Sequence, residues 1–368
     1  MSPRLAAFLL LAASAVAAPG RAATVERIGA APAGTQASPL SIGGRAAIDA
    51  ATGTVAYQWP GVYFESAFEG DQVDFGIGPG KVILHVQADG VPLATLDRPA
   101  TGFYRIAGLG PGPHRVRIDV ATESQAGPNR FDGFFAPPDS RAIPVAAPAR
   151  AIEFIGDSHT VGYGNRSPRR ECTEDEVWAT TDTTLAYGPR VARHFGAGYR
   201  VNAISGRGIV RNYGGMAADT LPQAYPYLLF DRATPDAGEG WDPRVIVVAL
   251  GTNDFSTPLH PGEPWPDRAA LRADYARTYV AFVQSLRARH PRARIVLWST
   301  DLFDGEIRAG VEDVLARLRA AGETRTTYLA MTGLRMDGCH AHPSLADHER
   351  IATALVAHID ALPVDWDG

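Results

Sequence analysis

Hydrophobic and polar positions alternate along the first third of the chain. The alternation is clearest at residues 62–68, 82–86 and 116–120, where apolar side chains recur at every second position. Glycine and proline interrupt the pattern roughly every eight to twelve residues, and Asp89-Gly90 after one run is typical of a hairpin turn. No segment of helical periodicity breaks the series. Residues 24–138 are therefore predicted to form an all-β sandwich of the jelly-roll type.

The pattern changes after residue 149. Residues 151–155, 245–250 and 295–298 are short, continuous apolar runs, as expected of parallel strands buried on both faces. Three further segments place apolar side chains on one helical face: Leu271, Tyr275, Tyr279, Phe282, Val283 and Leu286; Ile307, Val311, Val314, Leu315 and Leu318; and Ile351, Leu355, Ile359 and Leu362. Residues 150–368 are predicted to form a doubly wound α/β domain, joined to the sandwich by a proline-rich linker at residues 139–149.

The first 23 residues have a character of their own. A short positive start at Arg4 precedes an apolar run at residues 5–13 and a small-x-small cleavage site at residues 15–17. Residues 1–23 are therefore predicted to be a signal peptide, which implies a secreted or periplasmic protein. The apolar run is shorter than the roughly 20 residues that span a bilayer, so no membrane association is expected after cleavage.

Composition narrows the class of partner. The chain has 368 residues, 45% of them hydrophobic, and a net charge of −5, which fits a folded protein of about two domains. No clustered cations are present to neutralise phosphates, so a nucleic-acid partner is not expected. Nothing in the composition indicates an oligomeric state. In an oxidising compartment Cys172 and Cys339 could pair, or they could remain two buried thiols.

Three polar segments lie at expected strand ends. Ser158 follows residues 151–155, where it is either an exposed hydroxyl or the cap of the next helix. Gly206 lies in a short polar segment, where a glycine can bring a backbone N–H close to an anion. Asn253 comes just after residues 245–250 and carries a side-chain amide. Ligands of doubly wound sheets bind beyond the carboxyl ends of the strands, so we expect a site here.

A fourth polar block, residues 337–344, lies immediately before the last predicted helix and contains His340 and His342. In this order the four blocks resemble the SGNH branch of the GDSL esterase and lipase superfamily. The resemblance places Ser158 on the nucleophile, Gly206 and Asn253 on the glycine and asparagine, and one of the two histidines on the general base. It implies an SGNH hydrolase domain with a flavodoxin-like parallel sheet.

The sequence segments that contain three of these motifs resemble those of carbohydrate esterase family two. They are residues 156–165, 205–213 and 251–255. That family joins a jelly roll to an SGNH domain, so the resemblance covers essentially the mature chain. It implies a serine esterase that removes O-acetyl groups from xylan, mannan or their oligosaccharides. The alternatives are an SGNH esterase acting on another small acyl ester or a bacterial glycan, and an inactive carbohydrate-binding protein.

Ester hydrolysis by a serine explains these residue types. A histidine takes the proton from the Ser158 hydroxyl and returns it to the leaving group. The N–H groups of Ser158 and Gly206 and the Asn253 amide would stabilise the negative oxygen of the tetrahedral intermediate in an oxyanion hole. This chemistry needs no metal or organic cofactor. A zinc site built from Cys172, Cys339, His340 and His342 is the alternative, but the spacing matches no closed zinc motif.

Two registers compete for the base. Asp337 precedes His340 at the superfamily's usual acid-to-base spacing, whereas His342 followed by Pro343 fits the family-two word. We favour His342, which leaves no carboxylate where a triad needs one. The site is then predicted to be a Ser158–His342 dyad. The ring nitrogen of His342 that does not face the serine would donate its N–H to a backbone carbonyl.

Two further features concern the surroundings of the site. Trp178 and Trp265 are candidates for a sugar-binding wall, with ordinary core packing as the alternative. The family often has an aromatic residue directly before its histidine, and here that position is Ala341. Because both cysteines lie in loops expected at the carboxyl end of the sheet, we predict a disulfide between Cys172 and Cys339.

Overall fold

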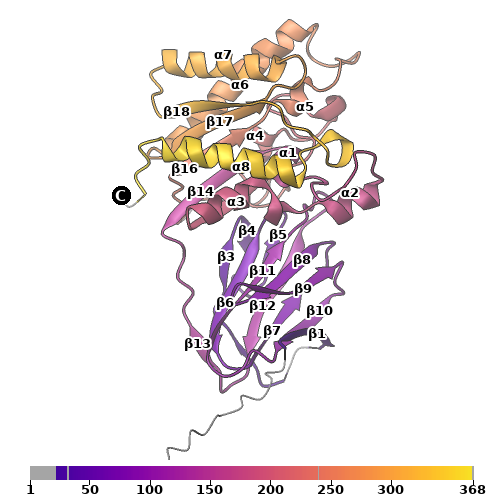
Figure 1. Ribbon diagram of the computed structural model, residues 1–368, viewed down its shortest axis with the longest axis vertical. Coiled ribbons are helices and arrows are strands. Elements are labelled where there is room, and N and C mark those ends of the chain that lie inside the picture. The colour runs from indigo at the N-terminus through magenta and orange to yellow at the C-terminus, as the bar shows by residue number, and fades with distance from the viewer. Residues whose placement is uncertain (1–21, 31–32, 239, 367–368) are drawn as a thin grey trace, which may run out of the picture.

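The computed structural model describes residues 22–30, 33–238 and 240–366. It consists of an antiparallel β sandwich and an α/β domain arranged one above the other along the long axis (Figure 1). Most of the predicted signal peptide lies outside the described residues. None of the described helices is long and apolar enough to cross a membrane.

The sandwich consists of two antiparallel sheets, whose inner faces form one core. The first has the order β1 (Thr24–Gly29), β10 (Gly102–Ala107), β7 (Gln72–Ile77), β12 (Asn129–Ala136), β5 (Val55–Tyr57) and β4 (Ala46–Ile48), and β2 (Gln36–Ala37) pairs with β12. The second has the order β13 (Arg141–Ile143), β6 (Tyr63–Glu69), β11 (Pro113–Val120), β8 (Ile83–Ala88) and β9 (Val91–Asp97), and β3 (Ser41–Gly43) pairs with β6. The alternation in the sequence has its physical cause here, because alternate side chains such as Phe64, Phe75, Ile118 and Phe131 fill the core.

The predicted linker at residues 139–149 is only partly a linker. Arg141–Ile143 form β13, which pairs with β6 at the edge of the second sheet. The sequence prediction was wrong at these three residues, since a three-residue edge strand is too short to show alternation. The chain then crosses to the α/β domain, where β14 begins at Arg150.

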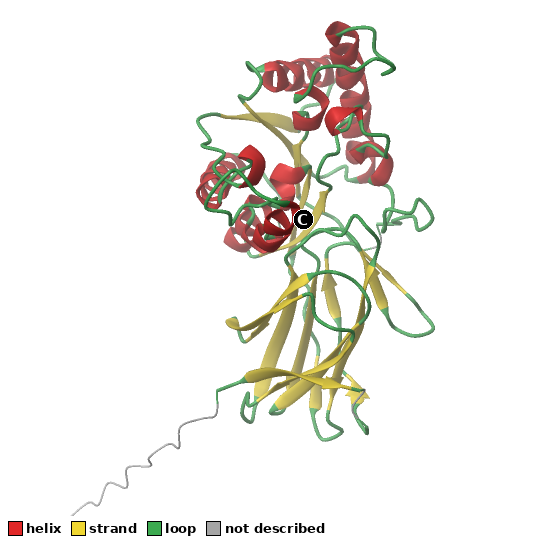
Figure 2. Cartoon of the chain, turned by 90° about the vertical axis from the view of Figure 1, so that its right-hand side faces the viewer, coloured by secondary structure: helices red, strands yellow, loops and turns green. Residues whose placement is uncertain are grey.

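The α/β domain has a five-stranded parallel sheet in the order β15 (Ala197–Ala203), β14 (Arg150–Gly156), β16 (Val245–Ala249), β17 (Arg294–Thr300) and β18 (Thr326–Met331). In chain order this is 2-1-3-4-5, the flavodoxin-like arrangement. Helices α3 (Tyr187–His194) and α8 (Leu345–Asp360) cover one face, and α6 (Arg268–Arg289) and α7 (Glu306–Ala320) cover the other. Figure 2 shows helices on both sides of the sheet.

Successive residues of the central strand face the two cores in turn. Val245 and Val247 pack with α3 and α8, while Ile246 and Val248 pack with α6 and α7. This explains the continuous apolar runs. One detail of the helix prediction was wrong: Leu362 packs on the same core but lies beyond the end of α8 at Asp360.

The loops at one end of the sandwich lie against the α/β domain (Figures 1 and 2). The Thr183 N–H donates to the Ala121 carbonyl at 2.8 Å, and the Trp59 indole N–H donates to the Tyr227 carbonyl at 3.2 Å. Arg45, which is 1% exposed, forms an ion pair with the buried Glu153 across the same boundary. The sandwich is therefore packed directly on the second domain.

Candidate active site

Ser158 lies at the exit of a buried strand. β14 ends at Gly156, where a Cβ atom would come within 1.9 Å of the Thr160 Oγ1, so only glycine fits this turn. The short helix α1 (Ser158–Val161) follows, and its N-cap is Asp157, whose side chain accepts the His159 N–H at 3.0 Å. The helix-cap alternative for Ser158 is therefore wrong, since the neighbouring aspartate caps the helix.

His342 contacts the serine hydroxyl directly. Its Nε2 lies 2.9 Å from the Ser158 Oγ, and its Nδ1 lies 2.9 Å from the Cys339 carbonyl oxygen. A carbonyl can only accept a hydrogen bond, so the proton sits on Nδ1 and leaves the Nε2 lone pair facing the hydroxyl. This arrangement matches the requirements of a serine nucleophile and its general base.

The competing histidine register has other partners. The His340 ring lies 3.1 Å from the Tyr163 hydroxyl through Nδ1 and 2.8 Å from the Cys172 carbonyl through Nε2. Asp337 forms ion pairs with Arg170 at 3.1 Å and Arg335 at 2.7 Å. His340 and Asp337 thus form their contacts with residues other than Ser158, and these contacts stabilise the loop.

The surroundings of His342 favour its neutral form. Burial lowers its pKa from the usual 6.5 to about 4, although the carbonyls that accept from Nδ1 act in the opposite direction. The Tyr163 ring lies against the imidazole with a centroid distance of 4.4 Å, and the His159 ring lies at 5.4 Å in a T-shaped arrangement. A neutral imidazole is the form that can accept the serine proton.

The expected oxyanion donors come from three loops at the same edge of the sheet. In the described part of the chain, the N–H groups of Ser158 and Gly206 donate no hydrogen bond. The Asn253 amide nitrogen donates to the Arg207 carbonyl at 2.8 Å and lies 3.3 Å from the Asp157 Oδ2. Two N–H donors are therefore available, and Asn253 is held at the same edge.

Two buried carboxylates support this edge. Asp254 accepts the N–H groups of Ile209, Val210 and Arg211 at 2.9–3.0 Å, which fixes the loop after Gly206. Burial raises its pKa to about 6, and burial raises the pKa of Asp157 to about 7. The bracing role of Asp254 was not predicted, although it directly follows Asn253 in the sequence.

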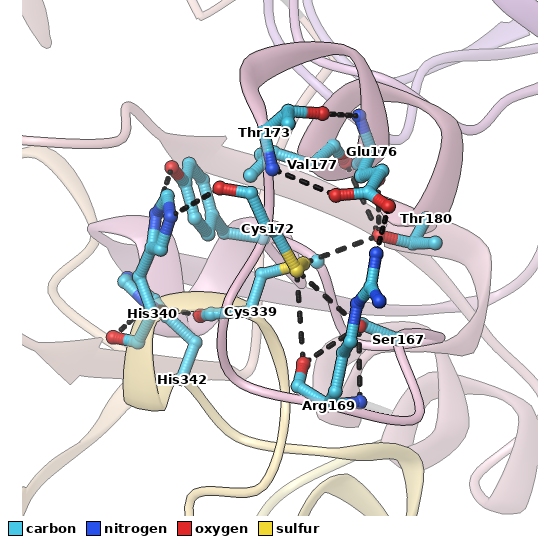
Figure 3. Close-up of a disulfide and its surroundings, with 12 residues drawn as sticks. Ser167, Arg169, Cys172, Thr173, Glu176, Val177, Thr180, Cys339, His340 and His342 are labelled. Atoms are coloured by element: carbon cyan, nitrogen blue, oxygen red, sulfur yellow. Dashed lines mark hydrogen bonds and ion pairs between the residues drawn. A yellow bond between two sulfur atoms is a disulfide. The ribbon is translucent and has the colours of Figure 1, made fainter.

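Cys172 and Cys339 form a disulfide bond. Figure 3 shows it between the loop that precedes α2 (Glu174–Thr180) and the loop that carries His340 and His342. Because both sulfur atoms are in the disulfide, the alternative zinc set has no thiolate to offer. The described residues also contain no cluster of three or more side chains suited to a metal ion.

The two tryptophans line separate cavities. Trp265 contributes to a cavity of about 430 Å³, and its indole N–H donates to Asp274 at 2.9 Å. Trp178 contributes to another of about 400 Å³, where the Arg98 guanidinium covers its ring at 3.8 Å from the centroid. One face of Trp178 is thus already covered.

Tyr213 is an exposed aromatic residue that the sequence analysis did not select. It is 58% exposed, and its N–H donates to the Gly206 carbonyl at 2.9 Å. The exposed Met216 follows three residues later. The exposed Tyr213 ring is thus tied to Gly206 through the main chain, and its only sequence signal was its place seven residues after Gly206.

Family comparisons agree with this geometry. Residues 42–145 match the carbohydrate esterase 2 N-terminal family, and residues 154–353 match the GDSL-like lipase/acylhydrolase family. The fold and the serine–histidine pair therefore define a carboxylic ester hydrolase of the GDSL type.

The whole-chain relatives are more specific. The chain is 40% identical over 336 residues, covering 90% of it and 93% of the relative, to an acetylxylan esterase/glucomannan deacetylase of Cellvibrio japonicus. It is also similar to a solved carbohydrate esterase whose active site displays divergent catalytic and non-catalytic binding functions (TM-score 0.85, 39% identity, 90% of this chain and 100% of that one). A family two carbohydrate esterase of Clostridium thermocellum, solved with cellohexaose, gives a TM-score of 0.76 at 25% identity, covering 88% and 98% of the two chains. The protein belongs to carbohydrate esterase family two.

Proposed function

We propose that this esterase removes O-acetyl groups from plant cell-wall polysaccharides such as xylan and mannan, or from their oligosaccharides. The observation that carries the proposal is the 2.9 Å contact between the Ser158 Oγ and the His342 Nε2, with the opposite ring nitrogen held by a carbonyl. The substrate class rests on the acetylxylan esterase/glucomannan deacetylase relative.

In the proposed mechanism Ser158 attacks the acetyl carbonyl while His342 takes the hydroxyl proton. The tetrahedral oxygen receives hydrogen bonds from the N–H groups of Ser158 and Gly206 and from the Asn253 amide, which turns from one of its present acceptors. His342 then returns its proton to the departing sugar hydroxyl. Water then attacks the acetyl-serine carbonyl while His342 takes its proton, and the proton passes to the Ser158 oxygen as its bond to the acetyl group breaks and acetate leaves.

Aromatic side chains around the site supply the proposed sugar-binding surfaces. Tyr213 is the most exposed, and Trp265 and Trp178 line two cavities to which Arg211 and Ser205, respectively, also contribute. Sugar rings pack their apolar faces on such side chains. We further propose that the protein is exported, because residues 1–23 read as a signal peptide and disulfides persist in oxidising compartments.

The test is acetate release from acetylated xylan and acetylated glucomannan, compared with hydrolysis of 4-nitrophenyl acetate. We expect activity on all three, and its near-complete loss in Ser158→Ala. Hydrolysis of the nitrophenyl ester alone would favour the other SGNH esterase reading. Wild-type turnover by Ser158→Ala would refute the serine mechanism, and glycan binding without any hydrolysis would favour a binding protein.

A further inference from the structure

The β sandwich reaches into the active site through one loop. Residues 121–125 follow β11, and the loop is fixed at its start, where the Ala121 carbonyl accepts the Thr183 N–H of the α/β domain at 2.8 Å. The Thr122 hydroxyl accepts the Ile83 N–H at 3.1 Å, and Gln58 donates to the Ser124 carbonyl at 3.1 Å. The loop is therefore anchored on both domains before it meets the catalytic edge.

Two side chains of this loop hold one residue of the α/β domain. The Glu123 Oε2 accepts the Ser205 N–H at 3.1 Å, and the Gln125 Nε2 donates to the Ser205 carbonyl at 3.1 Å. The Gln125 Nε2 also lies 3.4 Å from the Glu123 Oε2, so the carboxylate orients the amide. Both backbone groups of Ser205, which is 9% exposed, are thus bound from the other domain.

Peptide geometry makes this contact relevant to catalysis. The Ser205 carbonyl and the Gly206 N–H belong to the same peptide unit, which is planar and trans. The two groups point in opposite directions, so a hydrogen bond that fixes the carbonyl also aims the N–H. Gly206 has a φ of +81°. The Gly206 carbonyl accepts a hydrogen bond from the Tyr213 N–H, which fixes the peptide that follows Gly206.

We propose that Gln125 and Glu123 of the β sandwich are positioning residues that aim the Gly206 N–H into the oxyanion hole. The proposal rests on the role of that N–H in the proposed function. It gives the sandwich an indirect part in catalysis, because one of its loops fixes a peptide at the edge of the hydrolase domain. Neither side chain touches the reacting atoms, and both act through the Ser205–Gly206 peptide.

The test compares Gln125→Ala, Glu123→Ala and the double variant, each in the full chain with 4-nitrophenyl acetate. We expect kcat to fall about tenfold or more in each, with KM nearly unchanged, because the displaced donor acts mainly in the transition state. The double variant is expected to lose little more than the worse single variant, since both side chains hold one peptide. Glu123→Gln keeps an acceptor oxygen and is expected to restore most of the turnover.

The matched control is Tyr199→Phe. Tyr199 lies on β15, the strand that leads to Ser205, and its hydroxyl accepts an inter-domain hydrogen bond from Arg117 at 3.1 Å. This variant loses a contact between the same domains at the other end of the strand, and we expect wild-type kcat. The inhibition constant of phenylboronic acid, which forms a tetrahedral adduct with a reactive serine, is expected to rise in parallel with the loss of kcat in the loop variants only.

A loss of kcat below about threefold in the double variant would overturn the proposal, as would an equal loss in Tyr199→Phe. Loss of kcat without weaker binding of the boronate would also overturn it. Ser158→Ala in the same assay separates the two hypotheses. If that variant stays active the proposed site is wrong, whereas an inactive Ser158→Ala beside active loop variants refutes only the positioning role.

Discussion

The Nδ1 of His342 lies 2.9 Å from the carbonyl oxygen of Cys339, where a catalytic triad would have a carboxylate. The carbonyl fixes the tautomer and the ring orientation, but it carries no full charge to stabilise the imidazolium formed during catalysis. Asp337, the acid of the competing register, pairs with Arg170 and Arg335 instead. The geometry therefore supports the proposed Ser158–His342 dyad, with the Cys339 carbonyl in the place of a triad carboxylate.

Substitutions in the histidine loop should separate its members. We expect His342→Ala to be nearly inactive and His340→Ala to keep substantial turnover, because the ring of His340 contacts Tyr163 and the Cys172 carbonyl rather than the serine. Asp337→Asn should cost far less kcat than loss of a triad aspartate. The measurement is kcat on 4-nitrophenyl acetate, and an inactive Asp337→Asn beside an active His342→Ala would reverse the assignment.

Removing the side-chain oxyanion donor should affect turnover more than binding. We expect Asn253→Ala to lower kcat by about a hundredfold or more with little change in KM, since the donor acts when charge develops on the carbonyl oxygen. Thermal unfolding of the variant serves as the control, because the Asn253 amide also holds the Arg207 carbonyl. A change confined to KM would contradict the oxyanion role.

The sequence predicted both domains of the fold but not all of their edge strands. Alternation at residues 62–68 and continuous apolar runs such as 245–250 follow directly from burial on one or both faces. β18 was missed, because this edge strand carries the polar Thr326 and Thr327 and is only half-buried through its middle.

The contact between Ser158 and His342 could be predicted from the sequence. Four short sequence motifs in a fixed order led to the selection of Ser158, Gly206, Asn253 and His342. The acceptor of the His342 Nδ1 was foreseen only as some carbonyl, because its identity depends on the turn in which His340 and Ala341 adopt φ values of +52° and +57°. Contacts between Ser205 and the sandwich loop carry no signal, since they join side chains to the backbone of a distant segment.

The pH profile should extend into the acid range. The base must be neutral to accept the serine proton, and burial lowers the pKa of His342 to about 4, so protonation removes activity only as pH falls toward that value. We expect kcat/KM to have its acid limb well below 6.5. Asp157 and Asp254, with pKa values of about 7 and about 6, also titrate in this range, so the profile is measured in Asp157→Asn and in Asp254→Asn as well. An acid limb at pH 6–7 that persists in both variants would contradict a buried, neutral His342.

The disulfide between Cys172 and Cys339 links the loop before α2 to the histidine loop. It joins residues 167 positions apart, and chain-entropy arguments give such a loop about 5 kcal/mol of stabilisation before native strain is subtracted. It also fixes Cys339, whose carbonyl orients the base. We therefore expect the double variant Cys172→Ser with Cys339→Ser to unfold at a lower temperature and to have a lower kcat, with KM on 4-nitrophenyl acetate less affected.

Single variants and reduction supply the controls for this prediction. Cys172→Ser and Cys339→Ser should each resemble the double variant, since either one removes the bond. Treatment with dithiothreitol should lower the kcat of the wild type and leave that of the double variant unchanged. Mass spectrometry of the exported protein should find no free thiol. Two free thiols with full activity would contradict this prediction and would show that the rest of the loop holds the Cys339 carbonyl in place. The hydrogen bonds available for this are those from the Cys339 N–H to the Gly164 carbonyl and from the Gly338 N–H to the His342 carbonyl.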